Sequence, residues 1–298
     1  LNLKFIECFF NLNDNKVIYI AILIKFSVEY IVDIFLKVTF FLVYNIQYCC
    51  RGSYKTRSYL EGMDWMGKVG LLVLHGFTGS PYEIQTFVDY IRNHTDWVVE
   101  TPTFSGHGDA ESLALKGYKA EHWLMDAEIA YRKLARIVEK VMVVGFSMGG
   151  IIAMYLAKRY PVKKLVLLSA AAKYVNPTQL VKDIHSMAED MFHHKLNDSD
   201  LFLQYEQKLR NFPLSAAIQF MKIVSKTEPY ISHIECPVFI VQGALDEIVP
   251  STTAQYLYDE IPAKRKQLYI SDCGRHHICY SDDCDEWFRK ALDFLVEP

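Results

Sequence analysis

The sequence predicts an α/β fold in which a mostly parallel central sheet is flanked by helices and carries a small helical cap insertion. Short apolar runs alternate with segments of helical periodicity from about residue 68 onward. This alternation is typical of right-handed βαβ units. It breaks over about residues 170–231, where no comparable apolar strand occurs and several helices rich in Met, Phe, Leu and Tyr are expected. We interpret this stretch as the cap of a domain that spans residues 63–298.

Strands and helices can be assigned along the whole domain. Before the cap, short runs of strand character predict strands at 69–75, 97–100, 141–144 and 165–168. Helical patterns lie between them at 81–93, from Trp123 through Ile129 and Leu134 to Ile137, and at 148–160. After the cap, the expected order is a strand at 238–241, a helix at 251–260, a strand at 267–270 and a helix at 282–295.

The composition of residues 1–50 differs from that of the rest of the chain and changes sharply at Arg51-Gly52, and three interpretations of the extension 1–62 stay open. Residues 1–50 contain no Gly or Pro, and the first Met is Met63. A membrane anchor is one interpretation, but the apolar runs at 17–24 and 38–43 are each shorter than the ~20 residues of a spanning helix. An amphipathic helix is the second, because charges recur every fourth position: Lys25, Glu29, Asp33 and Lys37.

The third interpretation, which we favour, is translated non-coding sequence from an A+T-rich gene, with the protein starting near Met63. Membrane association is then expected only if residues 1–50 are genuine. A cleaved signal peptide is disfavoured, because no basic start, apolar run and small-residue cleavage site occur in order.

Composition narrows the classes of ligand. The net charge of −3 and the lack of a block of like charges give no reason to expect nucleic acid, so a small neutral or weakly polar substrate fits better. Seven cysteines, an odd number in a chain of this length, favour reduced thiols and a cytoplasmic location. The Cys- and His-rich stretch 273–284 lacks paired Cys-x-x-Cys spacing, and no metal is expected.

The pentapeptide Gly145-Phe-Ser-Met-Gly149 lies between an expected strand and an expected helix. In that context it predicts a nucleophile elbow, a sharp turn that exposes Ser147. The strained turn requires small neighbours, which both flanking glycines and Gly150 provide. The alternative is an ordinary strand-to-helix turn.

A serine nucleophile needs an imidazole base, and the base needs a carboxylate to orient it. Asp246 follows the strand at 238–241 and is the candidate acid, with Glu247 as the fallback; Asp246 could instead cap the next helix. His276 and His277 both lie in the loop before the last helix, and only one of them can be the base.

The segment Leu74-His-Gly-Phe-Thr-Gly79 follows the first expected strand. Its expected role is to aim the backbone N–H of Phe77 at a developing oxyanion. The second donor would be the N–H of Met148, at the start of a helix whose dipole also favours negative charge.

The chain resembles the bacterial carboxylesterase and monoacylglycerol-lipase branch of the α/β-hydrolases from about Lys68 to Leu295. The resemblance is carried, in this order, by residues 74–79, Ser105-Gly-His-Gly108, residues 145–149 and Asp246. The resemblance matches a Trp-x-x-Asp element to Trp123 and Asp126. It also aligns His276 with the base, although Gly274 replaces the usual Ser, and implies that the Cys-rich stretch is the histidine loop rather than a zinc site.

The resemblance implies hydrolysis of short- to medium-chain carboxylic esters or monoacylglycerols through an acyl-enzyme on Ser147, without a cofactor. Five cap residues could line an acyl pocket or form the cap's own core: Met187, Met191, Phe192, Phe220 and Met221. The alternatives on this fold are an acyltransferase, an amidase or peptidase, and a C–C hydrolase. From a different class, the chain could be a non-catalytic homologue that binds a small ligand.

Overall fold

The computed structural model describes residues 68–108, 114–172 and 214–297. The predictions for residues 1–62 and for most of the cap, including Met187, Met191 and Phe192, lie outside the described residues.

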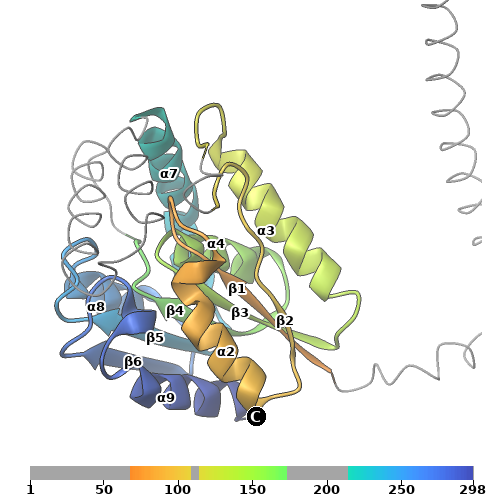
Figure 1. The fold of residues 1–298 in the computed structure, drawn as a ribbon, viewed down its shortest axis with the longest axis vertical. Coiled ribbons are helices and arrows are strands. Elements are labelled where there is room, and N and C mark those ends of the chain that lie inside the picture. The colour runs from red at the N-terminus through yellow and green to blue at the C-terminus, as the bar shows by residue number, and fades with distance from the viewer. Residues whose placement is uncertain (1–67, 109–113, 173–213, 298) are drawn as a thin grey trace, which may run out of the picture. The chain divides into compact units, whose positions relative to one another are not determined.

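A six-stranded sheet forms the centre of the described domain (Figure 1). Its strands are β1 (Val69–Leu74), β2 (Val98–Glu100), β3 (Lys140–Phe146), β4 (Val162–Leu168), β5 (Val238–Gly243) and β6 (Lys266–Ser271). The spatial order is β2-β1-β3-β4-β5-β6, and every pairing is parallel. The four inner strands are almost entirely buried, as their continuous apolar runs predict. The predicted parallel sheet is therefore confirmed.

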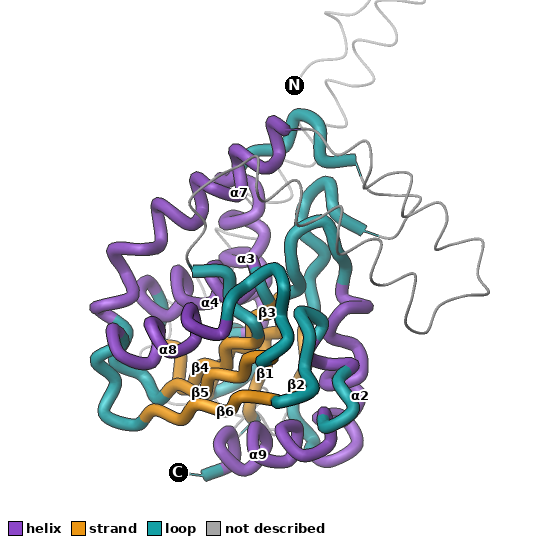
Figure 2. The backbone as a smooth tube through the Cα atoms, turned by 90° about the vertical axis from the view of Figure 1, so that its left-hand side faces the viewer, coloured by secondary structure: helices purple, strands orange, loops and turns teal. Residues whose placement is uncertain are grey.

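Helices cover both faces of this sheet (Figure 2). The 3₁₀ turn η2 (Pro81–Ile84) leads into α2 (Gln85–His94), which packs on one face with α9 (Cys284–Val296). The opposite face holds α3 (Ala120–Leu134), α4 (Met148–Arg159) and α8 (Ser251–Glu260). Helix α7 (Leu214–Thr227), which falls in the stretch predicted to be the cap, packs against α3 and α4, and η3 (Glu228–His233) follows it.

Helix α3 differs from its sequence pattern in the face that it buries. Ile129 is 57% exposed, and Ile137 lies beyond the end of the helix. The buried stripe is instead formed by Trp123, Ala127, Tyr131 and Leu134. Steps of three or four residues keep side chains on one helix face, whereas the six-residue step from Trp123 to Ile129 turns the side chain by about 120°.

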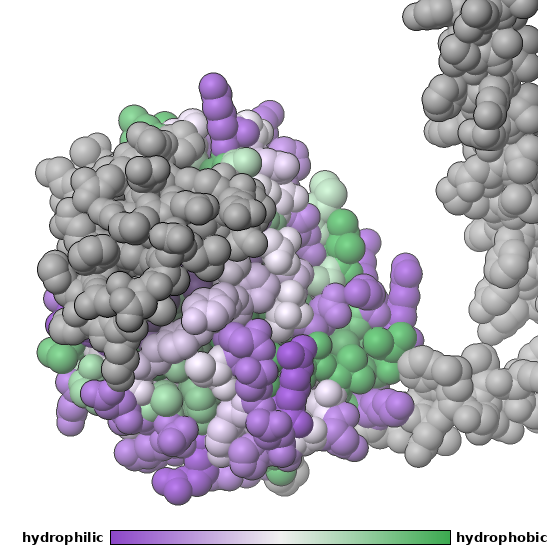
Figure 3. Space-filling view, viewed as in Figure 1, coloured by the Kyte–Doolittle hydropathy of each residue, from purple (hydrophilic) through white to green (hydrophobic). Residues whose placement is uncertain are grey.

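Much of the described surface in the view of Figure 3 is hydrophilic, with smaller apolar patches between the polar side chains. Within residues 68–108, 114–172 and 214–297, none of the helices combines the length and apolar character that crossing a membrane requires.

Candidate active site

Ser147 occupies the turn between β3 and α4 with φ 52° and ψ −113°. A non-glycine residue held at positive φ costs about 1–3 kcal/mol, so surrounding contacts must enforce this backbone. Three glycines permit these contacts. A Cβ atom at Gly145 would lie 2.6 Å from the Cα of Gly150, one at Gly149 2.6 Å from the carbonyl oxygen of His75, and one at Gly150 2.6 Å from the Cβ of Ala170. Each separation is too short for real atoms, so the elbow accepts glycine alone at these positions.

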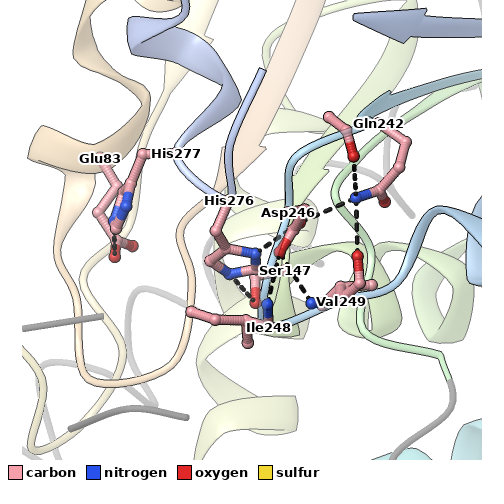
Figure 4. A network of polar contacts seen from close by, with 9 residues as sticks. Glu83, Ser147, Gln242, Asp246, Ile248, Val249, His276 and His277 are labelled. Atoms are coloured by element: carbon pink, nitrogen blue, oxygen red, sulfur yellow. Dashed lines mark hydrogen bonds and ion pairs between the residues drawn. The ribbon is translucent and has the colours of Figure 1, made fainter. Parts of the chain in front are cut away.

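Ser147, His276 and Asp246 form one chain of polar contacts (Figure 4). The Nε2 atom of His276 lies 3.1 Å from Oγ of Ser147, and its Nδ1 atom lies 2.9 Å from Oδ2 of Asp246. Ser147 follows β3, Asp246 follows β5 and His276 follows β6, so all three lie at the carboxyl edge of the parallel sheet. Each residue is less than a tenth exposed.

The carboxylate of Asp246 accepts from donors on both oxygens. The backbone N–H groups of Ile248 and Val249 donate to Oδ1 at 2.9 and 2.8 Å, and Nε2 of Gln242 donates to Oδ2 at 2.8 Å. Burial acts to raise the pKa of Asp246, but the charge of His276 and the hydrogen bonds outweigh it and hold this pKa below its ordinary value. Gln242 also donates to the carbonyl oxygen of Val249 at 3.0 Å, a role that its sequence position did not signal.

The alternative acid and base point elsewhere. Glu247 is exposed and pairs with Arg275 at 3.2 Å. Nε2 of His277 lies 3.4 Å from Oε1 of Glu83, on the far side of His276 from Asp246 (Figure 4). The structure thus brings His276 and Asp246 to Ser147, and not their neighbours.

Phe77 and Met148 lie on two segments that touch each other. The strands β1 and β3 are paired in register up to Leu74 and Gly145. A Cβ atom on Gly149 would collide with the carbonyl oxygens of Leu74 and His75, so the start of α4 packs directly against the loop that carries Phe77. Met148 is the first residue of α4, and its N–H therefore belongs to the four that have no acceptor within the helix. This arrangement suits two converging backbone donors.

His75 connects this loop to the next one. Its Nε2 atom accepts the N–H of Phe104 at 3.1 Å, so Nδ1 carries the proton and donates to the carbonyl oxygen of Gly76 at 2.8 Å. Burial lowers the pKa of His75 and keeps the ring neutral, although the charge of Glu83 opposes this.

The Trp-x-x-Asp element of α3 clamps the Gly-His-Gly loop. Nε1 of Trp123 donates to the carbonyl oxygen of Ser105 at 2.8 Å, and Oδ2 of Asp126 accepts the N–H of the same residue at 2.6 Å. Both backbone groups of Ser105 are satisfied in this way. Gly106 and Gly108 adopt φ values of 77° and 152°, which explains the glycines on either side of His107.

Four cysteines lie among the described residues, and all are free: Cys236, Cys273, Cys279 and Cys284. Burial raises the pKa of the Cys279 thiol well above its ordinary value, so this thiol is kept protonated.

The chain matches one protein family over most of its length. The family described as serine aminopeptidase, S33, matches residues 68–283. The chain belongs to this family of α/β-hydrolases. It is therefore a serine hydrolase, and the predicted resemblance is confirmed.

Two relatives of this S33 hydrolase are similar over most of their length. One is a thermostable monoacylglycerol lipase of Bacillus sp. (strain H-257), 25% identical over 243 residues that cover 78% of this chain and 92% of the relative. The other is a carboxylesterase of Bacillus subtilis (strain 168), 24% identical over 234 residues that cover 77% and 93%.

Solved structures share the fold of this S33 hydrolase. A structure from a study of the metagenome-derived lipolytic enzymes LipS and LipT has a TM-score of 0.62 at 22% identity, covering 76% of this chain and 93% of its own. An esterase from Exiguobacterium antarcticum has a TM-score of 0.60 at 18% identity, covering 78% and 92%.

Proposed function

We propose that this chain is a serine carboxylesterase that acts through an acyl-enzyme on Ser147, with His276 as the base and Asp246 as the orienting acid. The observation that carries the proposal is the continuous contact from Asp246 Oδ2 through His276 to Ser147 Oγ, at 2.9 and 3.1 Å. The esterase and lipase names of the relatives point to the same reaction class.

The arrangement accounts for each step of ester hydrolysis. Oγ of Ser147 attacks the ester carbonyl while Nε2 of His276 takes its proton, and the Asp246 carboxylate stabilises the imidazolium through Nδ1–H. Backbone N–H groups of Phe77 and Met148 receive the oxyanion. His276 then protonates the leaving alcohol, and the same nitrogen deprotonates the water that releases the acid.

For the substrate, we propose short- to medium-chain carboxylic esters or monoacylglycerols. Phe220 of the cap helix α7 supports an apolar acyl pocket next to the reaction centre, because its buried ring stacks on Phe77 at 5.0 Å between ring centroids. Met221, beside it, is partly buried against the same core. A panel of p-nitrophenyl esters from acetate to palmitate measures the chain-length preference.

The nucleophile is tested with a fluorophosphonate probe on the purified full chain. Wild-type protein should be labelled at Ser147 and lose esterase activity in step with labelling, and Ser147→Ala should show neither labelling nor turnover. Labelling that persists in Ser147→Ala would show that another residue is the nucleophile.

A peptidase is the second candidate, because the matching family is described as a serine aminopeptidase. The same Ser147 acyl-enzyme would form from an amide, with an amine in place of the alcohol as the leaving group. Comparison of kcat/KM for aminoacyl p-nitroanilides and p-nitrophenyl esters separates the two. A higher value for the anilides would replace the esterase proposal.

We also propose a cytoplasmic location, on the basis of the four free cysteines among the described residues. Cell fractionation followed by immunodetection tests it, and recovery of the protein in the membrane fraction would contradict it.

A further inference from the structure

Glu83 carries a buried carboxylate close to the candidate triad. This carboxylate takes no part in the steps of the proposed reaction. Glu83 belongs to η2, a few residues after the loop that carries Phe77, and is 9% exposed. Its two oxygens serve different partners: Oε2 accepts the backbone N–H of Gly76 at 2.8 Å, and Oε1 lies 3.4 Å from Nε2 of His277. Gly79 leaves room for it, because a Cβ atom there would overlap the Glu83 carboxylate.

His277 brings the other end of this contact to the triad. It directly follows His276, and the rings of both histidines lie against Phe146, at 5.1 and 5.6 Å between centroids. Phe146 is the residue before Ser147. The Glu83–His277 pair therefore links the Phe77 loop to the histidine loop, 194 positions away in the sequence, beside the nucleophile (Figure 4).

Two further hydrogen bonds join the same segments. Oγ1 of Thr86 donates to the carbonyl oxygen of Cys279 at 2.7 Å, and the hydroxyl of Tyr280 donates to the carbonyl oxygen of Tyr82 at 2.5 Å. Both η2 and the start of α2 are thus held against η4 (Ile278–Tyr280) by contacts that do not involve Glu83. Loss of the Glu83 carboxylate should disturb the Phe77 loop locally without separating the two segments.

The contacts of Gly76 explain why the carboxylate matters for the oxyanion donor. The N–H of Gly76 is bound by Glu83, and its carbonyl oxygen is bound by Nδ1–H of His75 at 2.8 Å. That carbonyl belongs to the same planar peptide unit as the N–H of Phe77, so fixing one fixes the direction of the other. Glu83 and His75 together determine where the Phe77 N–H points.

We infer that Glu83 and His277 form a positioning pair that holds the Phe77 donor in register with the base His276. Neither residue touches the reacting atoms. The inference rests on the proposed function, because the Phe77 N–H matters only if an oxyanion forms at Ser147. Removal of an oxyanion donor costs about 10²–10³ in rate, so misalignment of one should cost less.

The test compares kcat and KM for a p-nitrophenyl ester in full-length wild type, Glu83→Ala, Glu83→Gln, His277→Ala and the double variant Glu83→Ala/His277→Ala. Glu83→Ala should lower kcat by about 10- to 100-fold with KM within about threefold. Glu83→Gln keeps an acceptor for the Gly76 N–H and should recover most of kcat. The double variant should lose no more than Glu83→Ala, because the two residues act as one unit.

Glu128→Gln is the matched control. This carboxylate is also largely buried and accepts from the hydroxyls of Tyr155 and Tyr160, but it pairs with Arg159, the last residue of α4, about 18 Å along the helix from Ser147. It should change thermal stability and leave kcat unchanged.

Inhibition by a trifluoromethyl ketone, which forms a tetrahedral oxyanion on serine, should weaken in Glu83→Ala in step with kcat.

Each outcome decides the inference. A folded Glu83→Ala variant with kcat within twofold of wild type, or one that changes KM alone, would overturn it, as would failure of Glu83→Gln to recover kcat. Failure of the proposed function has a different signature, because wild type would then show no turnover that depends on Ser147. That result would overturn both.

Discussion

Asp246→Asn is the sharpest test of the candidate triad, because the structure shows what the substitution must break. Four donors converge on the carboxylate: two backbone N–H groups on Oδ1, and Gln242 Nε2 and His276 Nδ1 on Oδ2. Asparagine offers a single acceptor oxygen. Backbone N–H groups can only donate, so the side-chain oxygen of the asparagine should stay with the N–H groups of Ile248 and Val249. The side-chain NH₂ of the asparagine should then face His276.

The expected consequence is the wrong histidine tautomer. Nδ1 of His276 would become an acceptor and Nε2 would carry the proton, so the ring could not take the proton of Ser147. A loss of about 10⁴ in kcat is expected, equivalent to about 5 kcal/mol of barrier, with KM little changed. Loss of hydrogen bonds to a charged group should also lower the unfolding free energy by about 1.5–3 kcal/mol.

The assay is kcat for a p-nitrophenyl ester, with circular dichroism to confirm folding and Glu247→Gln as the matched control. Glu247 and Arg275 are 60% and 46% exposed, and such a pair contributes less than about 1 kcal/mol, so the control should keep kcat within about twofold. The acid assignment would be wrong if Asp246→Asn retained a tenth of wild-type kcat. It would also be wrong if Glu247→Gln lost as much kcat as Asp246→Asn.

The stability difference between wild type and Asp246→Asn should also depend on pH. Because the pKa of Asp246 in the folded protein lies below its ordinary value of 3.8, the carboxylate contributes stability that is present above that value and is lost as the pH falls through the folded pKa. Asparagine does not titrate, so the stability difference between wild type and Asp246→Asn should narrow as the pH is lowered below 4. Denaturant unfolding at a series of pH values measures this difference.

Three further substitutions test the packing around the site. Gly149→Ala should lower the unfolding free energy by about 1–3 kcal/mol and sharply reduce kcat, because the added Cβ would collide with backbone oxygens. Gly117→Ala is its control: φ is 90° there but no atom lies within 4 Å of the added Cβ, so this variant should show the cost of backbone strain alone and keep kcat. Burial holds the pKa of His107 well below 6.5, so wild type should lose up to about 1.4 kcal/mol of stability per pH unit below 6.5 relative to His107→Met, measured by urea unfolding. Lys164→Met removes an ammonium that donates to the carbonyl oxygens of Phe294, Leu295 and Glu297 at the end of α9, and should lower stability by about 1–3 kcal/mol in thermal melts without changing kcat.

The elements that the sequence predicted well are those whose signal is local. A continuous apolar run such as Val141–Val144 is sufficient for a central strand, and the glycines around Ser147 are required by contacts within the turn and its immediate neighbours. Ile129 was less predictable, because hydrophobicity alone does not state which helix face is buried. The α/β class and the elbow could therefore be derived before the structure was known.

The choice between adjacent candidates could not be made locally. His276 and His277 occupy the same loop, and Asp246 and Glu247 the same turn, so only the folded contacts with Ser147 and Glu83 distinguish them. Glu83 and Gln242 gave no signal of their own, because their partners depend on how distant segments meet. A carboxylate seven residues after Gly76 becomes informative once its burial against that loop is known.

The contacts behind the candidate triad follow one physical rule. Loops at the carboxyl edge of a buried parallel sheet carry backbone groups that water cannot reach, so side chains must satisfy them. Asp126 does this for Ser105, Gln242 for Val249 and Glu83 for Gly76. The bonds of Gln242 and Glu83 also fix the loops that carry Asp246 and Phe77, which the proposed reaction needs to be rigid. Since a donor aligned in advance stabilises a transition state without reorganisation, the demands of folding and of catalysis fall on the same side chains. Substitutions at these positions should then reduce kcat more than the loss of stability alone would explain.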